Sequence, residues 1–305
     1  MLRLGVVFSL LLVFLLVPIL GAREIPLTVA ASIPPLCDLV KQVGGERVAV
    51  VQLVPNGFNP HAYEPTPREV QAMAQAEAVF LVGLGFDTAF EKLLRGVDRQ
   101  KPIYFVSEGI EVLYGEDHHH HDEEEEHHEE DGKFPDPHVW VSLRNAMVMV
   151  ENIARFLSEI DPEGSSLYRE SAAAYREKLR ELDTRFQSAI GKVENRRFVV
   201  SHNAWSYLAR DYNLVLSGVI EKAPDREPTP QELRELITTM RSKKIRVIFV
   251  EPQFNQKIAQ TLAQETGSVL LTLDPLGSFP DLPYLELMEK NLSRILEGFT
   301  AHAGD

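Results

Sequence analysis

Short runs of apolar and β-branched residues alternate with longer amphipathic stretches along most of the chain. Strands separated by helices in this way are typical of parallel α/β sheets. The pattern occurs in the first half of the chain and again in the second half, which predicts two Rossmann-like lobes, each with a mostly parallel four-stranded sheet. The expected strands are residues 25–30, 47–53, 78–84, 103–106, 198–201, 214–219, 246–250 and 269–273.

Corresponding helix starts in the two halves look alike. Residues 66–69 (Thr-Pro-Arg-Glu) and 229–232 (Thr-Pro-Gln-Glu) each place threonine at the N-cap, proline at the first helical position and glutamate at the third. Such residues satisfy N–H groups that the first turn of a helix leaves without partners. Both stretches are therefore expected to begin helices directly after loops that follow strands.

A long polar stretch lies between the two halves. It follows Asp161 and reaches about Ile190 without glycine or proline after Gly164. As one helix it would be ~40 Å long, enough to brace two lobes, although an ordinary surface helix has the same pattern. The expected division is residues 23–161 for the N-terminal lobe, 162–191 for a rigid linker helix and 192–305 for the C-terminal lobe.

The first 22 residues have the pattern of a secretory signal peptide. Arg3 supplies a positive charge, residues 5–20 are apolar, and the small residues Gly21 and Ala22 follow. The only cysteine, Cys37, lies well beyond this run, so we expect no lipid-attachment cysteine and no intrachain disulfide. We predict a periplasmic protein that is not inserted in the membrane after signal cleavage, with an uncleaved anchor as the alternative.

Acidic charge is concentrated in one segment. Of the 45 acidic residues, ten lie in residues 116–131, together with six of the ten histidines. Outside this segment 31 basic residues face 35 acidic ones, so neither nucleic acid nor an anionic membrane surface is expected as a partner. The segment is expected to be a disordered loop, which either collects metal ions near a binding site or acts as a solubilising linker.

Three other histidines and one aspartate stand at joints between the expected elements. His61 lies in a proline-rich loop, His138 follows an Asp-Pro pair, and His202 and Asp274 follow strands of the second half. Ligands of open α/β sheets bind beyond the carboxyl ends of the strands. The loops of two facing lobes would therefore bring these four residues into one cleft between the lobes.

Three imidazoles and one carboxylate form a tetrahedral set that suits Zn²⁺. Nearby helix N-termini are expected to keep the imidazoles neutral, so that acid would release the metal. Glu64 or a water molecule is an alternative to Asp274 as the fourth ligand. Glu251, at the end of another expected strand, either orients His202 or is an ordinary solvated carboxylate.

Several ordered motifs carry a resemblance to a known family. They are residues 59–67 (Asn-Pro-His-Ala-Tyr-Glu-Pro-Thr-Pro), 136–140 (Asp-Pro-His-Val-Trp), 201–204 (Ser-His-Asn-Ala), 251–254 (Glu-Pro-Gln-Phe) and 273–277 (Leu-Asp-Pro-Leu-Gly). Over nearly the whole mature chain, the sequence resembles the substrate-binding proteins of zinc and manganese ABC importers, cluster A-I. It looks most like the zinc-uptake type.

The resemblance implies that His61, His138, His202 and Asp274 bind the metal and that a long helix joins the lobes. Manganese-type members tend to have glutamate at the third position, so His202 favours Zn²⁺ over Mn²⁺. Some zinc-type members have a disulfide in the second lobe, which a single cysteine cannot form. The implied function is high-affinity binding of Zn²⁺ and its delivery to the membrane permease of an ABC importer by a monomeric protein.

Other functions fit part of the pattern. A binder of manganese or iron in the same family is the nearest alternative, because ligand type biases metal selectivity without fixing it. A zinc-dependent hydrolase would use three protein ligands and a water, but the sequence has no HExxH helix and no clear general base. We therefore expect a binding protein and not an enzyme, with a zinc chaperone or an adhesin as further alternatives.

Overall fold

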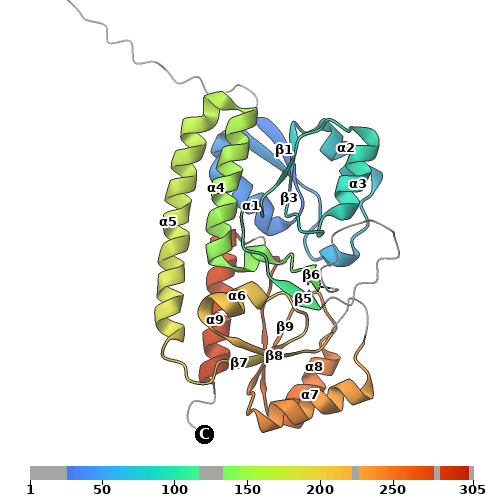
Figure 1. The fold of residues 1–305 in the computed structure, drawn as a ribbon, viewed down its shortest axis with the longest axis vertical. Coiled ribbons are helices and arrows are strands. Elements are labelled where there is room, and N and C mark those ends of the chain that lie inside the picture. Colours follow the sequence, from blue (N-terminus) through green and yellow to red (C-terminus); the bar gives the residue numbers. More distant parts are fainter. Residues whose placement is uncertain (1–25, 117–132, 222–226, 278–281, 302–305) are drawn as a thin grey trace, which may run out of the picture.

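The computed structural model describes residues 26–116, 133–221, 227–277 and 282–301. Two four-stranded sheets, each accompanied by its own helices, form two lobes that lie one above the other in Figure 1. A long helix runs beside both lobes. The predicted two-lobed α/β fold is confirmed, and each expected strand is present with its ends shifted by three residues or fewer.

The first sheet has four parallel strands in the order β2-β1-β3-β4. Its strands are fully buried where they face the helices, as at Val29 and Phe80. The predicted capping box at Thr66 and Glu69 is present at the start of α2. The elements are β1 (Leu27–Ala31), α1 (Pro34–Gly44), η1 (Gly45–Arg47), β2 (Val48–Gln52), η2 (Pro60–Ala62), α2 (Pro67–Gln75), β3 (Ala78–Leu81), α3 (Thr88–Val97) and β4 (Ile103–Phe105).

The second sheet has the order β10-β9-β7-β8, so its strands follow the same second-first-third-fourth order as those of the first lobe. Its helix α9 packs very closely on the sheet, because a Cβ atom on Gly298 would lie only 2.6 Å from Val247 Cγ2. Thr229 and Glu232 again form a capping box, at the start of α7. The elements are β7 (Arg197–Val200), α6 (Ser206–Tyr212), β8 (Val215–Val219), α7 (Pro230–Ser242), β9 (Val247–Val250), α8 (Lys257–Thr266), β10 (Val269–Thr272) and α9 (Tyr284–Thr300).

The lobes are joined by two antiparallel helices, α4 (Leu143–Ile160) and α5 (Ser165–Ile190). Helix α5 has 26 residues and contacts α1 in the first lobe and α9 in the second, which confirms the predicted long joining helix. It begins at Ser165 because residues 162–164 form the short 3-10 helix η4 (Pro162–Gly164). A partly buried pair fixes this turn, since Arg47 Nε and Nη2 each donate to the Asp161 carboxylate at 3.0 Å.

Two three-residue strands that the sequence did not predict form an antiparallel hairpin between the lobes. They are β5 (Tyr114–Glu116) and β6 (Lys133–Pro135), followed by η3 (Val139–Val141). Strands this short leave no periodic pattern in a sequence. Glu116, which was expected to begin the disordered loop, is instead the last residue of β5, and the remainder of that loop lies outside the described residues.

None of the helices in the described ranges combines the length and apolar character needed to cross a bilayer. The predicted signal peptide of residues 1–22 lies outside those ranges. Cys37 is buried in α1, with its Sγ donating to the Ala31 carbonyl at 3.5 Å. Burial raises the pKa of this thiol to about 12, so it stays protonated at neutral pH.

Candidate metal centre

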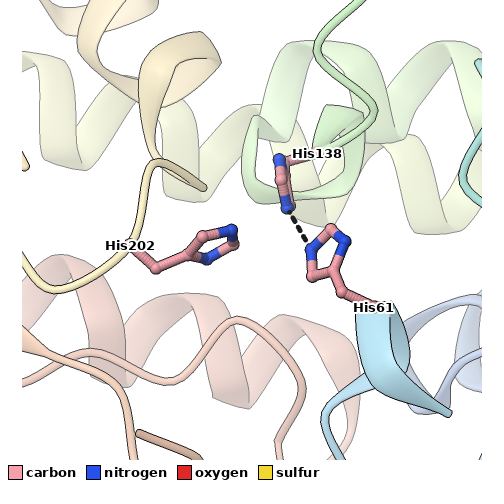
Figure 2. Close-up of side chains that lie close together, drawn as sticks. All are labelled: His61, His138 and His202. Carbon is pink, nitrogen blue, oxygen red and sulfur yellow. Dashed lines mark hydrogen bonds between the residues drawn. The ribbon is translucent and has the colours of Figure 1, made fainter. Parts of the chain in front are cut away.

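Three of the four predicted ligands come together between the lobes. In the described part of the chain, His61, His138 and His202 each offer a ring nitrogen, and these atoms all lie within 4.8 Å of one another. Figure 2 shows the three rings pointing toward a common centre from three separate segments. His61 lies in η2 after β2, His138 is the N-cap of η3, and His202 follows β7.

The closest pair of ring nitrogens has a spacing that suits one bound metal ion. His61 Nε2 and His138 Nε2 are 3.0 Å apart (Figure 2). Two nitrogens bound to one zinc at about 2.0–2.1 Å and at the tetrahedral angle would lie roughly 3.3 Å apart. Only a small movement of either ring would therefore be needed to give this pair the spacing of two zinc ligands.

His138 is held by the carboxylate of Asp136. Asp136 Oδ1 accepts from His138 Nδ1 at 2.8 Å and from the backbone N–H of His138 at 3.0 Å. Burial alone would raise the pKa of Asp136, but the hydrogen bonds and charge of His138 lower it below the ordinary value. With Nδ1 engaged in this way, Nε2 of His138 is directed at the other two rings.

His202 lies beside a second buried carboxylate. Its Nδ1 is 3.4 Å from Glu251 Oε1, which also accepts from the indole N–H of Trp205 at 3.2 Å. Burial works to lower the pKa of His202, but the nearby charges of Glu251, Asp136 and Glu221 outweigh it and raise this pKa. The expectation that a helix N-terminus keeps this ring neutral is therefore wrong, since α6 begins only at Ser206 and the carboxylate dominates.

Aromatic rings line two sides of the cluster. The Phe86 ring lies edge-on to His61 with centroids 5.2 Å apart, and it also packs against Trp140. The Phe254 ring stacks on His202 with centroids again 5.2 Å apart. These rings surround the imidazoles with apolar surface and exclude water, which strengthens polar interactions there.

The loop that carries His61 is organised by its own residues. The Asn59 side chain caps η2 by accepting from the His61 backbone N–H at 3.0 Å. The Phe58 ring meets Tyr63 edge-on, and Tyr63 in turn stacks on Phe90 of α3. His61 itself is partly exposed, whereas His138 is only 5% exposed, so the His61 side of the cluster is the more open to solvent.

Asp274, the fourth predicted ligand, is not a member of the imidazole cluster. Its Oδ1 accepts from the backbone N–H groups of Leu276 and Gly277 and from Gln253 Nε2. Its backbone is held by Asn291 of α9, which bonds both the N–H and the carbonyl of Asp274. Glu64, the alternative to Asp274, is exposed to solvent.

Sequence reasoning missed several neighbours of the three imidazoles. The spacing of Asp136, two residues before His138, could have indicated an aspartate that orients the histidine ring. No local signal marks Phe86 or Phe254, because their contacts with the imidazoles depend on tertiary packing. The sequence allows Glu251 to be either an orienting or a solvated carboxylate; at 3% exposure it is buried beside His202, so it is not solvated.

Two α/β lobes joined by a long helix, with imidazoles facing one another between them, define the class of two-lobed substrate-binding proteins. The chain matches the family model described as zinc-uptake complex component A, periplasmic, over residues 29–298. It belongs to this family. The protein is thus the extracytoplasmic substrate-binding component of a metal ABC transporter, which works with a membrane permease and is not an enzyme.

Similar proteins differ in the metal that their names mention. The metal ABC transporter substrate-binding lipoprotein SsaB of Streptococcus sanguinis is 29% identical over 285 residues, which cover 89% of each chain. A crystal structure of ZnuA has a TM-score of 0.80 and 31% identity, covering 90% of this chain and 99% of that one. The structure of the Pseudomonas aeruginosa protein FpvC in complex with Mn²⁺ has a TM-score of 0.80 and 27% identity, covering 90% and 99%.

SsaB is named a lipoprotein, whereas the present sequence led us to expect no lipid-attachment cysteine. In the present chain the only cysteine is Cys37, which lies in the core of the first lobe.

Proposed function

We propose that this protein captures Zn²⁺ at His61, His138 and His202 and delivers it to the permease of its ABC transporter. One observation carries the proposal, namely the convergence of three imidazoles from three segments within 4.8 Å. Each ring can present a lone pair to one ion, and imidazole is a preferred ligand of Zn²⁺. Two of the rings also lie beside buried carboxylates, an arrangement that raises the basicity of metal-binding histidines.

Zinc is proposed over manganese because of the donor atoms and their surroundings. Mn²⁺ prefers oxygen ligands, often in octahedral sets, whereas the nearest groups here are three nitrogens. The Phe86 and Phe254 rings occupy space beside His61 and His202 that additional oxygen ligands would need. Manganese is the second candidate, since FpvC is similar over nearly the whole chain and its structure contains Mn²⁺.

Asp274 is proposed as the fourth ligand, with Glu64 or water as alternatives. Because Asp274 Oδ1 accepts three hydrogen bonds in the metal-free structure, the Asp274 side chain would have to change its conformation to bind the ion. Asp274→Asn keeps an oxygen for the turn while removing the negative charge. We expect this variant to lose more zinc affinity than Glu64→Gln, and equal affinities in isothermal titrations of both variants and the wild type would favour water.

We further propose that the mature protein is a monomer in the periplasm, without a lipid anchor. The proposed division places residues 23–161 in the first lobe, 162–191 in the linker and 192–305 in the second lobe. Edman sequencing and mass spectrometry of the exported protein test the cleavage site and any lipid. Light scattering tests whether the mature protein is a monomer.

The decisive test is a titration of metal-stripped protein in which a two-residue Asn-Gly turn replaces residues 117–132, so that the β5–β6 hairpin can still close, with Zn²⁺ and Mn²⁺ in competition. We expect one tightly bound zinc per chain. His202→Ala should bind zinc at least about 100-fold more weakly, because losing one of four ligands removes roughly a quarter of the binding free energy typical of such a site. Asn203→Ala, which alters the exposed neighbour of His202, is the matched control and should bind as the wild type does. Preference for Mn²⁺, or no tight site in this deletion variant, would refute the proposal.

A further inference from the structure

A hydrogen bond is missing from the end of the hairpin, and a side chain from the second lobe takes its place. The backbone N–H of Asp136 donates to the Leu113 carbonyl at 2.7 Å. In a regular antiparallel pair the Leu113 N–H would donate back to the Asp136 carbonyl. Instead, the Tyr207 hydroxyl accepts from the Leu113 N–H at 3.1 Å and donates to the Asp136 carbonyl at 2.7 Å.

This hydroxyl connects the segments that carry two of the three imidazoles. Tyr207 is the second residue of α6, five residues after His202. Asp136, on the other side of the bridge, holds the His138 ring through Nδ1. The two imidazole rings have centroids 4.9 Å apart, so the bridge links both partners of a close pair.

The bridge is well suited to act as a spacer of fixed length. Tyr207 is fully buried, and its ring lies beneath the Arg210 guanidinium of the same helix. Further contacts hold the His138 segment against the second lobe, because the Trp140 indole donates to the Pro275 carbonyl at 2.8 Å and Ser142 Oγ donates to Asp211. His138 therefore precedes the linker helix in the chain but is attached by hydrogen bonds to the lobe that follows it.

We propose that Tyr207 is a positioning residue of the metal site, whose hydroxyl sets the separation of His138 and His202 by keeping Asp136 close to α6. The inference rests on the proposed function, because it concerns the geometry of the same site. Without the hydroxyl, the Leu113 N–H could bond the Asp136 carbonyl directly. That would close the hairpin and draw Asp136, together with His138, away from His202.

Helix α6 offers a matched control for this effect. Tyr212 is also buried, and its hydroxyl donates to Asp183 of α5 at 2.7 Å, away from the imidazoles. Tyr207→Phe and Tyr212→Phe therefore remove the same group from the same helix. A purely structural role for both hydroxyls predicts lower melting temperatures and unchanged metal binding in both variants.

The test compares the two variants in the full chain. Zinc affinity is measured by competition with a chelator, the geometry of the site by the visible absorption of bound Co²⁺, and stability by melting of the metal-free protein. We expect Tyr207→Phe to bind zinc about 10-fold more weakly, at the lower end of losses seen when partners of metal ligands are removed, and to change the Co²⁺ spectrum. Tyr212→Phe should keep the wild-type affinity and spectrum although its melting temperature falls.

Wild-type affinity and an unaltered Co²⁺ spectrum in Tyr207→Phe would overturn the inference while leaving the proposed function intact. If instead the wild type binds zinc no better than His202→Ala, the proposed function fails and the inference fails with it. A second measurement uses only the wild type and therefore does not depend on whether the variant folds. Zinc should slow hydrogen exchange of the Leu113 amide. The Val215 amide, which bonds Arg196 at the start of β8, is the control, and equal responses at both amides would also overturn the inference.

Discussion

The two lobes share a strand order but use the reversal point of that order differently. The reversal lies between the first and third strands of each sheet, where open α/β sheets bind ligands. In the second lobe, the loops after β7 and β9 hold His202 and Glu251. In the first lobe, the corresponding loop after β3 is closed on itself, because Asp87 Oδ2 accepts from the Gly83 N–H at 2.8 Å.

The first lobe therefore supplies its imidazole from another place, the loop after its edge strand β2, which carries His61. The loop at the reversal point of the first lobe instead supports the His61 ring. Gly83, Leu84 and Gly85 all have positive φ angles, and this tight turn presents Phe86 to the His61 ring. A buried acidic side chain thus lies beside an imidazole in one lobe and accepts a hydrogen bond from a backbone turn in the other, so identical topology does not imply identical chemistry.

A second parallel between the lobes gives the largest expected effect. After the fourth strand of each sheet, an asparagine from a later helix holds the loop: Asn291 bonds the backbone of Asp274, and Asn152 bonds the carbonyls of Val106 and Glu108. Asn291 is only 2% exposed, so Asn291→Ala leaves two backbone groups without partners and should lower the free energy of unfolding by about 3 kcal/mol.

Asn152 is less buried, and Asn152→Ala should lower the free energy of unfolding by about 1 kcal/mol. Urea denaturation of the two metal-free variants measures both changes. Zinc titration then separates the lobes, since only Asn291→Ala should weaken zinc binding if Asp274 is a ligand. Equal zinc affinities in the two variants would remove Asp274 from the site.

How far the sequence predicts this molecule follows from the range of the interactions involved. The eight sheet strands and the capping boxes at Thr66 and Thr229 were predictable, because they depend on local patterns of a few residues. The convergence of His61, His138 and His202 was predictable from their positions at joints between the expected elements. The Tyr207 bridge was not, since it joins residues 71 and 94 positions apart and leaves no periodic trace.

Glu251→Gln tests the carboxylate of the second lobe and should have the next largest effect. Loss of this charge makes the His202 ring less basic, so zinc affinity should fall about 10-fold to 100-fold. Glu251 helps to raise the pKa of His202, and protons compete with zinc for this ring. The fall of affinity on acidification should therefore begin at a lower pH in Glu251→Gln than in the wild type.

Zinc titrations between pH 5 and pH 8, roughly the range in which histidine titrates, measure both effects of this variant. Asp87→Asn is the control from the first lobe, and it should keep the wild-type zinc affinity because Asp87 supports a turn and not an imidazole. A similar loss of affinity in both variants would mean that the reversal points of the two lobes contribute alike to zinc binding.

The smallest effect is expected for the stability of Asp87→Asn. Burial raises the pKa of Asp87 to about 6 from its ordinary value of 3.8, so between these pH values the folded state binds a proton that the unfolded state has released. The contribution of Asp87 to stability is therefore complete below pH 3.8 and is lost as the pH rises through about 6. Asparagine is neutral throughout and keeps an oxygen for the Gly83 N–H.

The difference between the two pKa values means that ionisation of Asp87 lowers the free energy of unfolding by at most about 3 kcal/mol, and relaxation of the turn reduces this loss. We therefore expect the free energy of unfolding of Asp87→Asn to exceed that of the wild type by about 1 kcal/mol above pH 7. Near pH 4 the two proteins should unfold at nearly the same urea concentration. Denaturation of the metal-free proteins at both pH values measures the difference. If Asp87→Asn were the less stable protein above pH 7, the ionised carboxylate would itself hold the turn, and the first lobe would resemble the second in depending on a buried negative charge.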